Sequence, residues 1–469
     1  MEVRSQEFPE AARAAIANTR LQEAVKSATD GLLRKRAAAV ADFSGWEELR
    51  EKGRAIKSHT IANLPAYVNQ FSENARRRSA RVFLARDAAA ANRYILELAT
   101  RQQVKRVVKS KSMVTEEIGL NAALERGGIE SIETDLGEYI IQLAGERPSH
   151  IVAPVIHRTR EDISQLFAQK LGSLPGASEQ ELTQVARRTL REKFLTAEMG
   201  ISGGNFAVAE TGSVVIVENE GNARLTTSVP RIHVAVIGME KLIPRWADLQ
   251  VFLQLLARSG TGQKMTSYVS ILTGPKRSSE LDGPQEAHIV ILDNGRSAIA
   301  ADPKMRESLH CIRCGACLNT CPVYRQMGGH PYGWAYSGPI GAVFTPLMVG
   351  MQRAPDLPFA SSLCGACESI CPVKIPIPSM LLHLRQRLME KSAQAPLFQS
   401  LAMAVWRFFM QNPTRYRMAG WLLRKTFPLV ERGPGSRLME NWTKFRELPR
   451  PAERSFRQQW RKSAPGSQE

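Results

Sequence analysis

Two short stretches decide the fold of this chain: "CIRCGACLNTCP" at 311–322 and "SSLCGACESICP" at 361–372. Both contain C-G-A-C and end in C-P, but Ser361 stands where the pattern of the first places another cysteine. Together they hold all seven cysteines of the chain: Cys311, Cys314, Cys317, Cys321, Cys364, Cys367 and Cys371. Because no thiol is left for a disulfide framework elsewhere, this clustering indicates metal or redox chemistry.

The first stretch has the spacing C-x2-C-x2-C-x3-C-P, which is typical of 4Fe-4S clusters. In such pairs of motifs the first three thiols hold one cluster, and the fourth reaches the other. The spacing therefore predicts two clusters with exchanged ligands. The first would be held by Cys311, Cys314, Cys317 and Cys371, and the second by Cys321, Cys364 and Cys367.

The missing eighth thiol leaves three readings of the second cluster. It is a 4Fe-4S cluster with an open or non-cysteine ligand, a 3Fe-4S cluster, or a cluster that uses the Ser361 oxygen. Serine is a hard and rarely used ligand, so we favour a cluster with three cysteines. A pair of zinc sites is the alternative for C-x-x-C spacings, but three evenly spaced thiols followed by C-P argue against it. The glycines of C-G-A-C, Gly315 and Gly365, are expected to let the backbone approach the sulfurs and donate amide hydrogen bonds.

Composition places the chain among globular proteins. It has 469 residues, 43% of them hydrophobic, with no apolar run long enough to span a bilayer and no signal-peptide pattern at the N-terminus, so we expect a cytoplasmic protein. The net charge is +18, and residues 391–469 hold 15 basic residues against 5 acidic ones. No nucleic-acid-binding motif accompanies this charge, so nucleic acid is not expected as a partner. A solvated surface, an acidic partner or peripheral contact with an anionic membrane face remain open.

Short Val- and Ile-rich runs alternate with amphipathic helices between about residues 60 and 300, which predicts an α/β domain with a largely buried sheet. One expected helix begins with Thr115 as N-cap and ends at Gly127 and Gly128. We expect four parts: an N-terminal helical segment (1–60), the α/β domain (61–300), an α-helical two-cluster ferredoxin-type domain (301–390) and a basic helical C-terminal region (391–469).

These motifs, in order along nearly the whole chain, resemble those of the lactate-utilisation protein B family. The resemblance is carried by "KSKSMVTEEIGLNAALE", "GISGGNFAVAETGSVVIVENEGNARLTTSVPRIHVAVIGMEKLIP", "CIRCGACLNTCPVYR", "SGPIGAVFTPLM" and "SSLCGACESICPVKIPIP". It implies that 61–300 is a lactate-utilisation (LUD) domain, similar to sugar-isomerase and CoA-transferase-like folds. It also implies lactate-utilisation A and C subunits as partners, in a bacterial system that oxidises L-lactate to pyruvate.

Oxidation of a 2-hydroxy acid needs a two-electron acceptor before one-electron carriers take over. "GISGGN" and "SGTGQKMTS" lack the dinucleotide and Walker spacings, so we expect an electron-transfer subunit rather than a complete dehydrogenase. An electron-transfer hub for another 2-hydroxy acid dehydrogenase and an iron or redox sensor are the alternatives.

Several polar residues of the α/β domain are candidates for substrate binding. Glu210 interrupts an apolar strand pattern and is a candidate acid or base, and Arg224 and Arg231 are candidates for pairing with a substrate carboxylate. The loop with Lys109, Lys111 and Ser112 is a candidate anion site at a strand end.

For each of these candidates the ordinary interpretation is a surface loop, an internally paired glutamate or solvated arginines. His233 is expected to be a core histidine. The C-terminal aromatic residues are expected to pack on a neighbouring domain, with a partner or membrane surface as the alternative: Trp406, Phe408, Phe409, Trp421 and Trp442.

Overall fold

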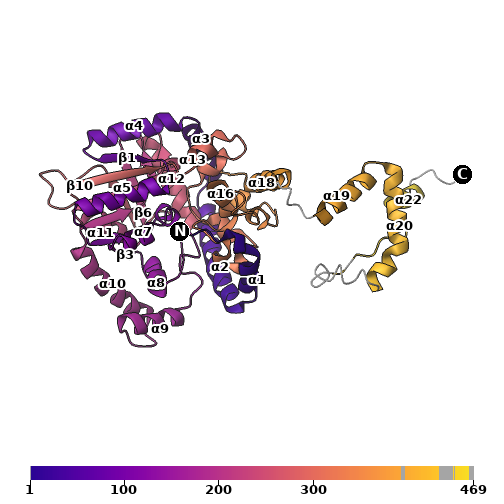
Figure 1. Ribbon diagram of the computed structural model, residues 1–469, viewed down its shortest axis with the longest axis horizontal. Coiled ribbons are helices and arrows are strands. Elements are labelled where there is room, and N and C mark those ends of the chain that lie inside the picture. The colour runs from indigo at the N-terminus through magenta and orange to yellow at the C-terminus, as the bar shows by residue number, and fades with distance from the viewer. Residues whose placement is uncertain (1, 392–396, 433–446, 448, 464–469) are drawn as a thin grey trace. The chain divides into compact units, whose positions relative to one another are not determined.

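The computed structural model describes residues 2–391, 397–432, 447 and 449–463, and divides into two compact units (Figure 1). The first unit comprises residues 1–388 and the second residues 389–469. The first unit contains both sheets and all seven cysteines.

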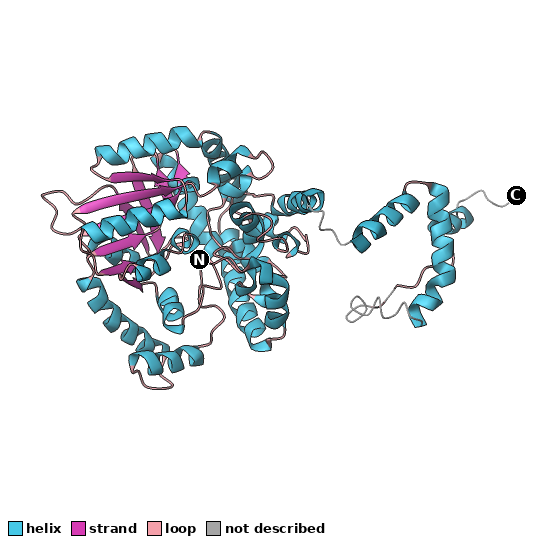
Figure 2. Ribbon diagram, viewed as in Figure 1, coloured by secondary structure: helices cyan, strands magenta, loops and turns pink. Residues whose placement is uncertain are grey.

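A six-stranded, fully parallel sheet forms the centre of the first unit, in the order β1-β10-β7-β4-β2-β3 (Figure 2). Its strands are buried on both faces: Val234 and Val236 of β7 pack on one side, while Ala235 and Ile237 pack on the other. This confirms the α/β class expected from the Val- and Ile-rich runs. The strands are β1 Arg81–Ala85, β2 Arg106–Lys109, β3 Glu130–Glu133, β4 Met199–Ser202, β7 Ile232–Gly238 and β10 Glu286–Leu292.

A second, four-stranded sheet has the order β8-β5-β6-β9. Its buried residues share a core with the face of the parallel sheet that carries Ala235 and Ile237. Glu210 lies in the turn between β5 and β6, where Gly212 N–H donates to the Val208 carbonyl at 2.9 Å. The polar interruption in the apolar run is therefore the turn of a hairpin. These strands are β5 Phe206–Val208, β6 Ser213–Glu218, β8 Leu242–Ile243 and β9 Tyr268–Leu272.

Helices cover both faces of the parallel sheet. Residues of α5, α6 and α7 share a core with one face, and residues of α4 and α12 share a core with the other. Helices α8 and α10 pack beyond the β2–β3 end. The helices of this domain are α4 Leu64–Arg77, α5 Ala88–Arg101, α6 Met113–Glu117, α7 Leu120–Arg126, α8 Leu136–Ala144, α9 Arg160–Leu171, α10 Glu179–Thr196, α11 Asn222–Ser228, α12 Trp246–Gly260 and α13 Arg296–Ala301, with the 3-10 turn η2 Met239–Lys241.

The helix expected to begin at Thr115 is instead two helices, which corrects that prediction. Ser112 is the N-cap of α6, and its hydroxyl accepts the Thr115 N–H at 3.3 Å. Gly119, with φ of 65°, separates α6 from α7, whose C-cap is Gly127. The Thr115 hydroxyl is used differently, because it accepts a hydrogen bond from the Lys109 amine at 3.1 Å.

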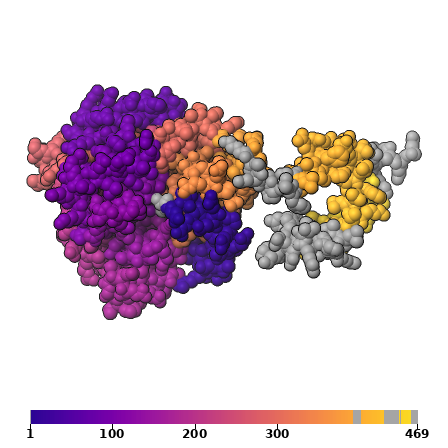
Figure 3. All heavy atoms as spheres, in the orientation of Figure 1, coloured from indigo at the N-terminus to yellow at the C-terminus, as the bar shows by residue number. Residues whose placement is uncertain are grey.

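The N-terminal helices pack on the cysteine-rich region as well as on the α/β domain. Helix α2 contacts α14 and α15, whereas α3 contacts α12 and the 3-10 turn η3. In Figure 3 the N-terminal residues, in indigo, lie against the orange cysteine-rich region. The elements are η1 Ser5–Glu7, α1 Phe8–Ile16, α2 Thr19–Ala41, α3 Trp46–Ala62, η3 Arg306–His310, α14 Ala316–Thr320, α15 Tyr324–Met327, η4 His330–Tyr332, α16 Gly338–Val349, η5 Leu357–Phe359, α17 Ala366–Ile370 and α18 Ile377–Lys391.

The second unit is helical in its described part, with α19 Leu397–Met410, α20 Pro413–Arg432 and α22 Phe456–Ser463. Trp406, Phe408 and Trp421 are each more than half exposed. Phe408 packs edge-on against Phe409 and under the Arg415 guanidinium. Trp442 lies outside the described residues. No helix in the described ranges is long and apolar enough to cross a membrane.

A buried charge network joins the parallel sheet to the cysteine-rich region. Arg296, at the start of α13, donates to both oxygens of Glu117 at 2.9 and 2.7 Å and to Glu240 Oε2 at 2.5 Å. All three side chains are fully buried. The Tyr336 hydroxyl, from the cysteine-rich region, donates to Glu117 Oε2 at 2.6 Å. Although burial disfavours the charge of Glu240, Arg296 and Arg313 lower the pKa of this carboxyl to about 2.

We expect the substitution Arg296→Met to lower the free energy of unfolding by about 3–5 kcal/mol, because it leaves two buried carboxylates without their cation. The matched control is Arg86→Met, since Arg86 is 84% exposed in its pair with Asp87, and a change below about 1 kcal/mol is expected there. Chemical unfolding followed by circular dichroism measures both. Equal effects of the two substitutions would contradict the role of the network.

Candidate iron-sulfur centre and adjoining cavity

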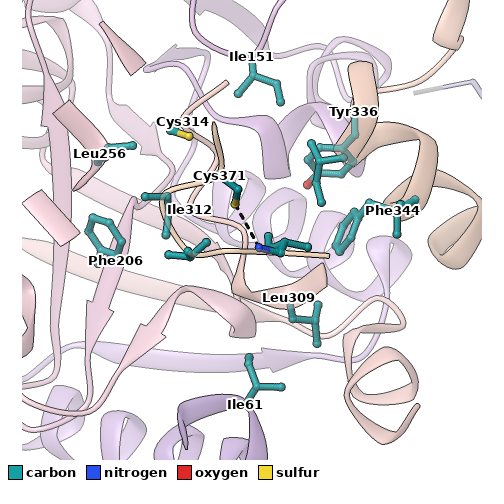
Figure 4. Close-up of a cluster of buried hydrophobic side chains, with 14 of the residues drawn as sticks. Ile61, Ile151, Phe206, Leu256, Leu309, Ile312, Cys314, Tyr336, Phe344 and Cys371 are labelled. Carbon is teal, nitrogen blue, oxygen red and sulfur yellow. Dashed lines mark hydrogen bonds between the residues drawn. The ribbon is translucent and has the colours of Figure 1, made fainter. Parts of the chain in front are cut away.

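Four cysteines from the two motifs line one small cavity inside the first unit. Cys311, Cys314 and Cys317 come from the first motif, and Cys371 comes from the second. Apart from Arg313, the side chains of the rest of the wall are apolar and include Ile151, Ile340, Val373, Ile375 and Ile377. Figure 4 shows Cys314 and Cys371 among these buried side chains, with Ile151 and Ile312 close by. These are the same four thiols that the spacing assigns to the first cluster.

The local backbone suits sulfur ligands. Gly315 and Gly365 adopt φ of 77° and 82°, the left-handed conformation that favours glycine, immediately before α14 and α17. The Ile375 N–H donates to Cys371 Sγ at 3.4 Å, as the dashed line in Figure 4 marks. The Tyr324 N–H donates to Cys321 Sγ at 3.5 Å. Such donors stabilise negative charge on a thiolate.

Burial raises the pKa of the Cys314 thiol to about 12 and that of Cys371 to about 11. Neighbouring thiols add to the effect, since Cys371 and Cys311 disfavour a charge on Cys314. These thiols therefore stay protonated until a bound cation compensates their charge. A donor set of this kind fits an iron-sulfur cluster, whose binding releases the protons.

The other three cysteines form a second group. Burial, with Cys321 and Cys364 as neighbours, raises the pKa of Cys367 to about 12. Cys364 is exposed, and hydrogen bonds from the Ala366 N–H and from Ser362 lower its pKa. The Ser361 hydroxyl accepts the Leu363 N–H at 3.1 Å. This group therefore opens to the surface at Cys364.

The described residues contain no set of three His, Cys, Asp or Glu side chains placed to hold a single metal ion. The assignment of the thiols to clusters therefore rests on their spacing and on the cavity that four of them share.

Basic side chains from the N-terminal helices brace the second motif. Arg36 of α2 donates to the Ile370 carbonyl at 3.1 Å. Arg50 of α3 donates to the Cys371 carbonyl at 3.0 and 2.8 Å and to the Ser369 carbonyl at 2.9 Å. Positive charge this close to the thiols stabilises the anionic form of a cluster and favours its reduced state.

A larger cavity of about 430 Å³ adjoins the first cysteine group. It lies where β2 and β4 end, between the loops 110–112 and 203–205, at the carboxyl edge where parallel α/β sheets bind ligands. Cys314 and Arg313 line both this cavity and the smaller one. The carboxyl edge of the sheet and the first cysteine group therefore share a wall.

Two cations in this wall were not predicted from the sequence. Lys241, in η2 after β7, and Arg313, between two cysteines of the first motif, both line the cavity. Burial, together with Arg313, lowers the pKa of the Lys241 amine to about 8, so that it stays largely protonated at neutral pH. Arg313 lies in the C-I-R-C run, which is the one signal in the sequence that could have drawn attention to it.

The residues of the predicted anion-binding loop do not all face the cavity. Lys111 and Ser112 line the cavity. Lys109 instead points into the protein, where its amine lies 2.6 Å from Glu133 and 3.0 Å from Glu116. Burial opposes its charge, but these two carboxylates outweigh that effect and raise the pKa of Lys109.

Glu210, Arg224 and Arg231 are not brought together, and none of them is among the described residues that line the cavity. The Glu210 carboxylate accepts the Trp246 N–H at 2.7 Å, at the start of α12. Arg224 is exposed on α11. Arg231 lies before β7, at the amino edge of the sheet, and donates to the Gln102 carbonyl at 2.6 Å.

His233 is a buried structural histidine. Its Nε2 lies 2.8 Å from the Ser202 hydroxyl, and burial lowers the pKa of the ring to about 4. It is therefore neutral at physiological pH and bonded across β4 and β7, which agrees with its interpretation as a core residue.

A parallel α/β domain joined to two cysteine motifs with a shared, buried thiol cavity defines an iron-sulfur protein of the dicluster class. Three family models match the chain: the LUD domain at residues 68–292, the 4Fe-4S dicluster domain at residues 307–375, and "Lactate utilisation protein B, C-terminal" at residues 383–464. Their order follows the order of the motifs in the sequence.

Relatives that align over nearly the whole chain indicate the same family. Lactate utilization protein B of Oceanobacillus iheyensis is 44% identical over 97% of this chain and 96% of its own length. The protein of that name from Anoxybacillus flavithermus is 45% identical over 97% of this chain and 98% of its own length. The chain therefore belongs to the lactate utilization protein B family, which confirms the resemblance seen in its motifs. A solved DUF162 family protein from Deinococcus radiodurans aligns at 13% identity with a TM-score of 0.28, over 49% of this chain and 98% of that one.

Glu138 of α8 lies beside Lys111 of the loop 110–112, and it makes the free energy of unfolding dependent on pH. Burial raises its pKa to about 8; Lys111, 3.9 Å away, opposes this, and Glu133 and Glu116 add to it. Because the folded pKa lies above the ordinary value of 4.5, the folded state holds an extra proton between these two values, and stability falls as the pH rises through that window.

We expect Glu138→Gln to remove this loss, so that the variant gains stability over the wild type by at most roughly 1.4 kcal/mol per pH unit between about pH 5 and about pH 8. Thermal unfolding of both proteins across this range measures the difference. The exposed Glu125→Gln is the control and should give a difference that does not change with pH. A constant difference for Glu138→Gln as well would contradict the raised pKa.

Proposed function

We propose that this chain is the iron-sulfur electron-transfer subunit of a complex that oxidises L-lactate to pyruvate and supports growth on lactate. The observation that carries the proposal is the cavity lined by Cys311, Cys314, Cys317 and Cys371, in a chain of the lactate utilization protein B family. In the proposed complex its partners are the lactate-utilisation A and C subunits.

In this proposal the four thiols of that cavity hold the first cluster, and Cys321, Cys364 and Cys367 hold the second. Two bound clusters would supply two one-electron carriers, which matches the two electrons released when a 2-hydroxy acid becomes a 2-oxo acid. The role of this chain's own residues is to hold and shield these carriers. Ile151, Ile340 and Ile375 exclude water from the first site, while Arg36 and Arg50 fix the backbone of the second motif.

The two cysteine groups differ in their access to solvent. From this difference we infer the direction of electron transfer. The first group is surrounded mostly by apolar side chains, together with Arg313, and adjoins the cavity at the edge of the sheet. The second includes the exposed Cys364. We propose that electrons enter near the buried group and leave through the exposed one toward the terminal acceptor.

The test is an anaerobic EPR titration of the purified chain, alone and with its two partner subunits, on addition of L-lactate. We expect signals of reduced clusters only when the partners are present, because the two-electron step needs an acceptor that we assign to the complex. D-lactate is the control substrate, and dithionite shows that the clusters are reducible.

Failure of L-lactate to reduce the clusters in any combination, while dithionite still reduces them, would contradict the proposal. Faster reduction by another 2-hydroxy acid would instead support the electron-transfer hub. Cluster-dependent, specific binding of nucleic acid without lactate-linked reduction would support a redox sensor.

A further inference from the structure

We propose that the 430 Å³ cavity beside Cys314 is a binding site for a small organic carboxylate, held by Lys241 and Arg313. The choice of a 2-hydroxy or 2-oxo acid as that carboxylate rests on the proposed function. The assignment of an anion rests only on the geometry of the cavity.

Both cations are buried, and neither has a hydrogen-bonded anion at its charged end in the described ranges. Lys241 is 7% exposed and Arg313 is 8% exposed. Among the described residues, Lys241 has no hydrogen-bond or ion-pair partner, and neither terminal nitrogen of Arg313 makes a hydrogen bond. The closest carboxylate oxygen to Arg313 is Glu240 Oε1, at 3.6 Å. A buried cation without a hydrogen-bonded partner is costly, so an anion in the cavity would remove this cost.

The other buried cations of the same region are satisfied. Arg296 uses its donors on Glu117, Glu240 and the Asp293 carbonyl. Lys109 is paired with two glutamates, and the Lys57 amine donates to the Glu240 carbonyl. Unlike these side chains, and unlike Lys111, which donates to the Val152 carbonyl at 2.9 Å, the Lys241 amine and the terminal nitrogens of Arg313 make no hydrogen bond within the described part of the chain.

Aromatic side chains fix the direction of Arg313. Its guanidinium carbon lies 4.3 Å from the ring centroids of both Tyr336 and Phe344. Tyr336 is itself held by its hydrogen bond to Glu117. A guanidinium held in this way presents a fixed fork of donors, which suits a carboxylate.

Acidic side chains also line the cavity, but each of them accepts a hydrogen bond from at least one backbone amide. The Glu218 carboxylate accepts the Ala223 and Arg224 N–H groups, both at 2.8 Å. Glu220 accepts the Leu136 N–H at 2.9 Å, and Asp135 accepts the Glu138 N–H at 3.2 Å. Each of these carboxylates therefore has at least one oxygen engaged by the backbone, and Glu218 has both.

The remaining wall suits a small organic molecule rather than a bare inorganic ion. The volume lies within the range of roughly 300–1,000 Å³ typical of small-molecule sites. Ile151, Ile216, Val217 and Leu256 provide apolar surface in the same cavity. A ligand with a charged carboxylate and a carbon body uses both parts of this wall.

Arg313 and Lys241 lie close to the thiols, so neutralising a bound cluster is the competing role for their charge. Under that role, neutralising Lys241 would shift the reduction potential of the first cluster and leave ligand affinity unchanged. Under our proposal, affinity itself depends on Lys241. The two roles are therefore separated by measuring binding and potential on the same variant.

The experiment is anaerobic calorimetry of the full-length, cluster-loaded chain with L-lactate, pyruvate and inorganic phosphate as probes. We expect the organic acids to bind, and Lys241→Met to weaken binding by about tenfold or more, because a charge-assisted hydrogen bond is lost. Lys241→Arg should keep most of the affinity, and Lys52→Met, on an exposed position of α3, should keep all of it. Iron content confirms that each variant retains its clusters. Binding of pyruvate should also change the EPR spectrum of the dithionite-reduced chain, since Cys314 is in the wall.

Equal affinity of the wild type and Lys241→Met, no binding of either acid, or a shifted potential with unchanged affinity would each overturn the site. Phosphate binding as tightly as the acids, with the same dependence on Lys241, would overturn the carboxylate assignment. Lysine-dependent binding of the acids by a chain whose clusters L-lactate never reduces would support the site while refuting the lactate-oxidising function. Reduction of the clusters by L-lactate, together with binding that does not depend on Lys241, would support the lactate-oxidising function while refuting the site.

Discussion

The meeting of the two cysteine motifs at one buried cavity is the constraint on which this architecture depends. Three thiols of the first motif and Cys371 of the second line one cavity, so segments about 50 residues apart in the sequence must meet. Helices α14 and α17, which carry the two motifs, pack against each other. Arg36 and Arg50 then tie the second motif to α2 and α3, more than 300 residues away along the chain. The N-terminal helices are thus part of the support of the cysteine-rich region.

The α/β domain and the cysteine-rich region are joined by buried charge as well as by packing. Arg296, just after β10, binds Glu117 and Glu240, and Tyr336 extends the network to the wall of the cavity. Arg313 lies against Tyr336 and within 3.6 Å of Glu240. The same network that holds the two parts together therefore also shapes the wall between the thiols and the edge of the sheet. Structure and proposed function depend on the same few side chains.

The class of the fold was predictable because it depends on local patterns, and the cysteine spacing selects the same four thiols that line one cavity. Val- and Ile-rich runs indicate buried parallel strands, and the C-x2-C-x2-C-x3-C-P spacing identifies thiols that cooperate. The adjoining cavity was not predictable, since Lys241 and Arg313 come together only through the tertiary fold. Lys109 was expected to bind an anion, but it forms ion pairs with two glutamates that lie 7 and 24 residues further along the chain. Glu210 interrupts the apolar run because the chain turns there between the two strands of a hairpin. The sequence alone does not distinguish such a turn from a polar residue within a single strand.

The exchange of ligands can be tested most directly by comparing single alanine variants of the cysteines. EPR spectra and iron contents would be recorded for dithionite-reduced Cys371→Ala, Cys311→Ala, Cys321→Ala and Cys367→Ala. The exchange predicts that Cys371→Ala has the same defect as Cys311→Ala, although the two residues belong to different motifs, and that Cys321→Ala has the same defect as Cys367→Ala. If Cys321→Ala instead matched Cys311→Ala, each motif would hold its own cluster and the central claim would be wrong.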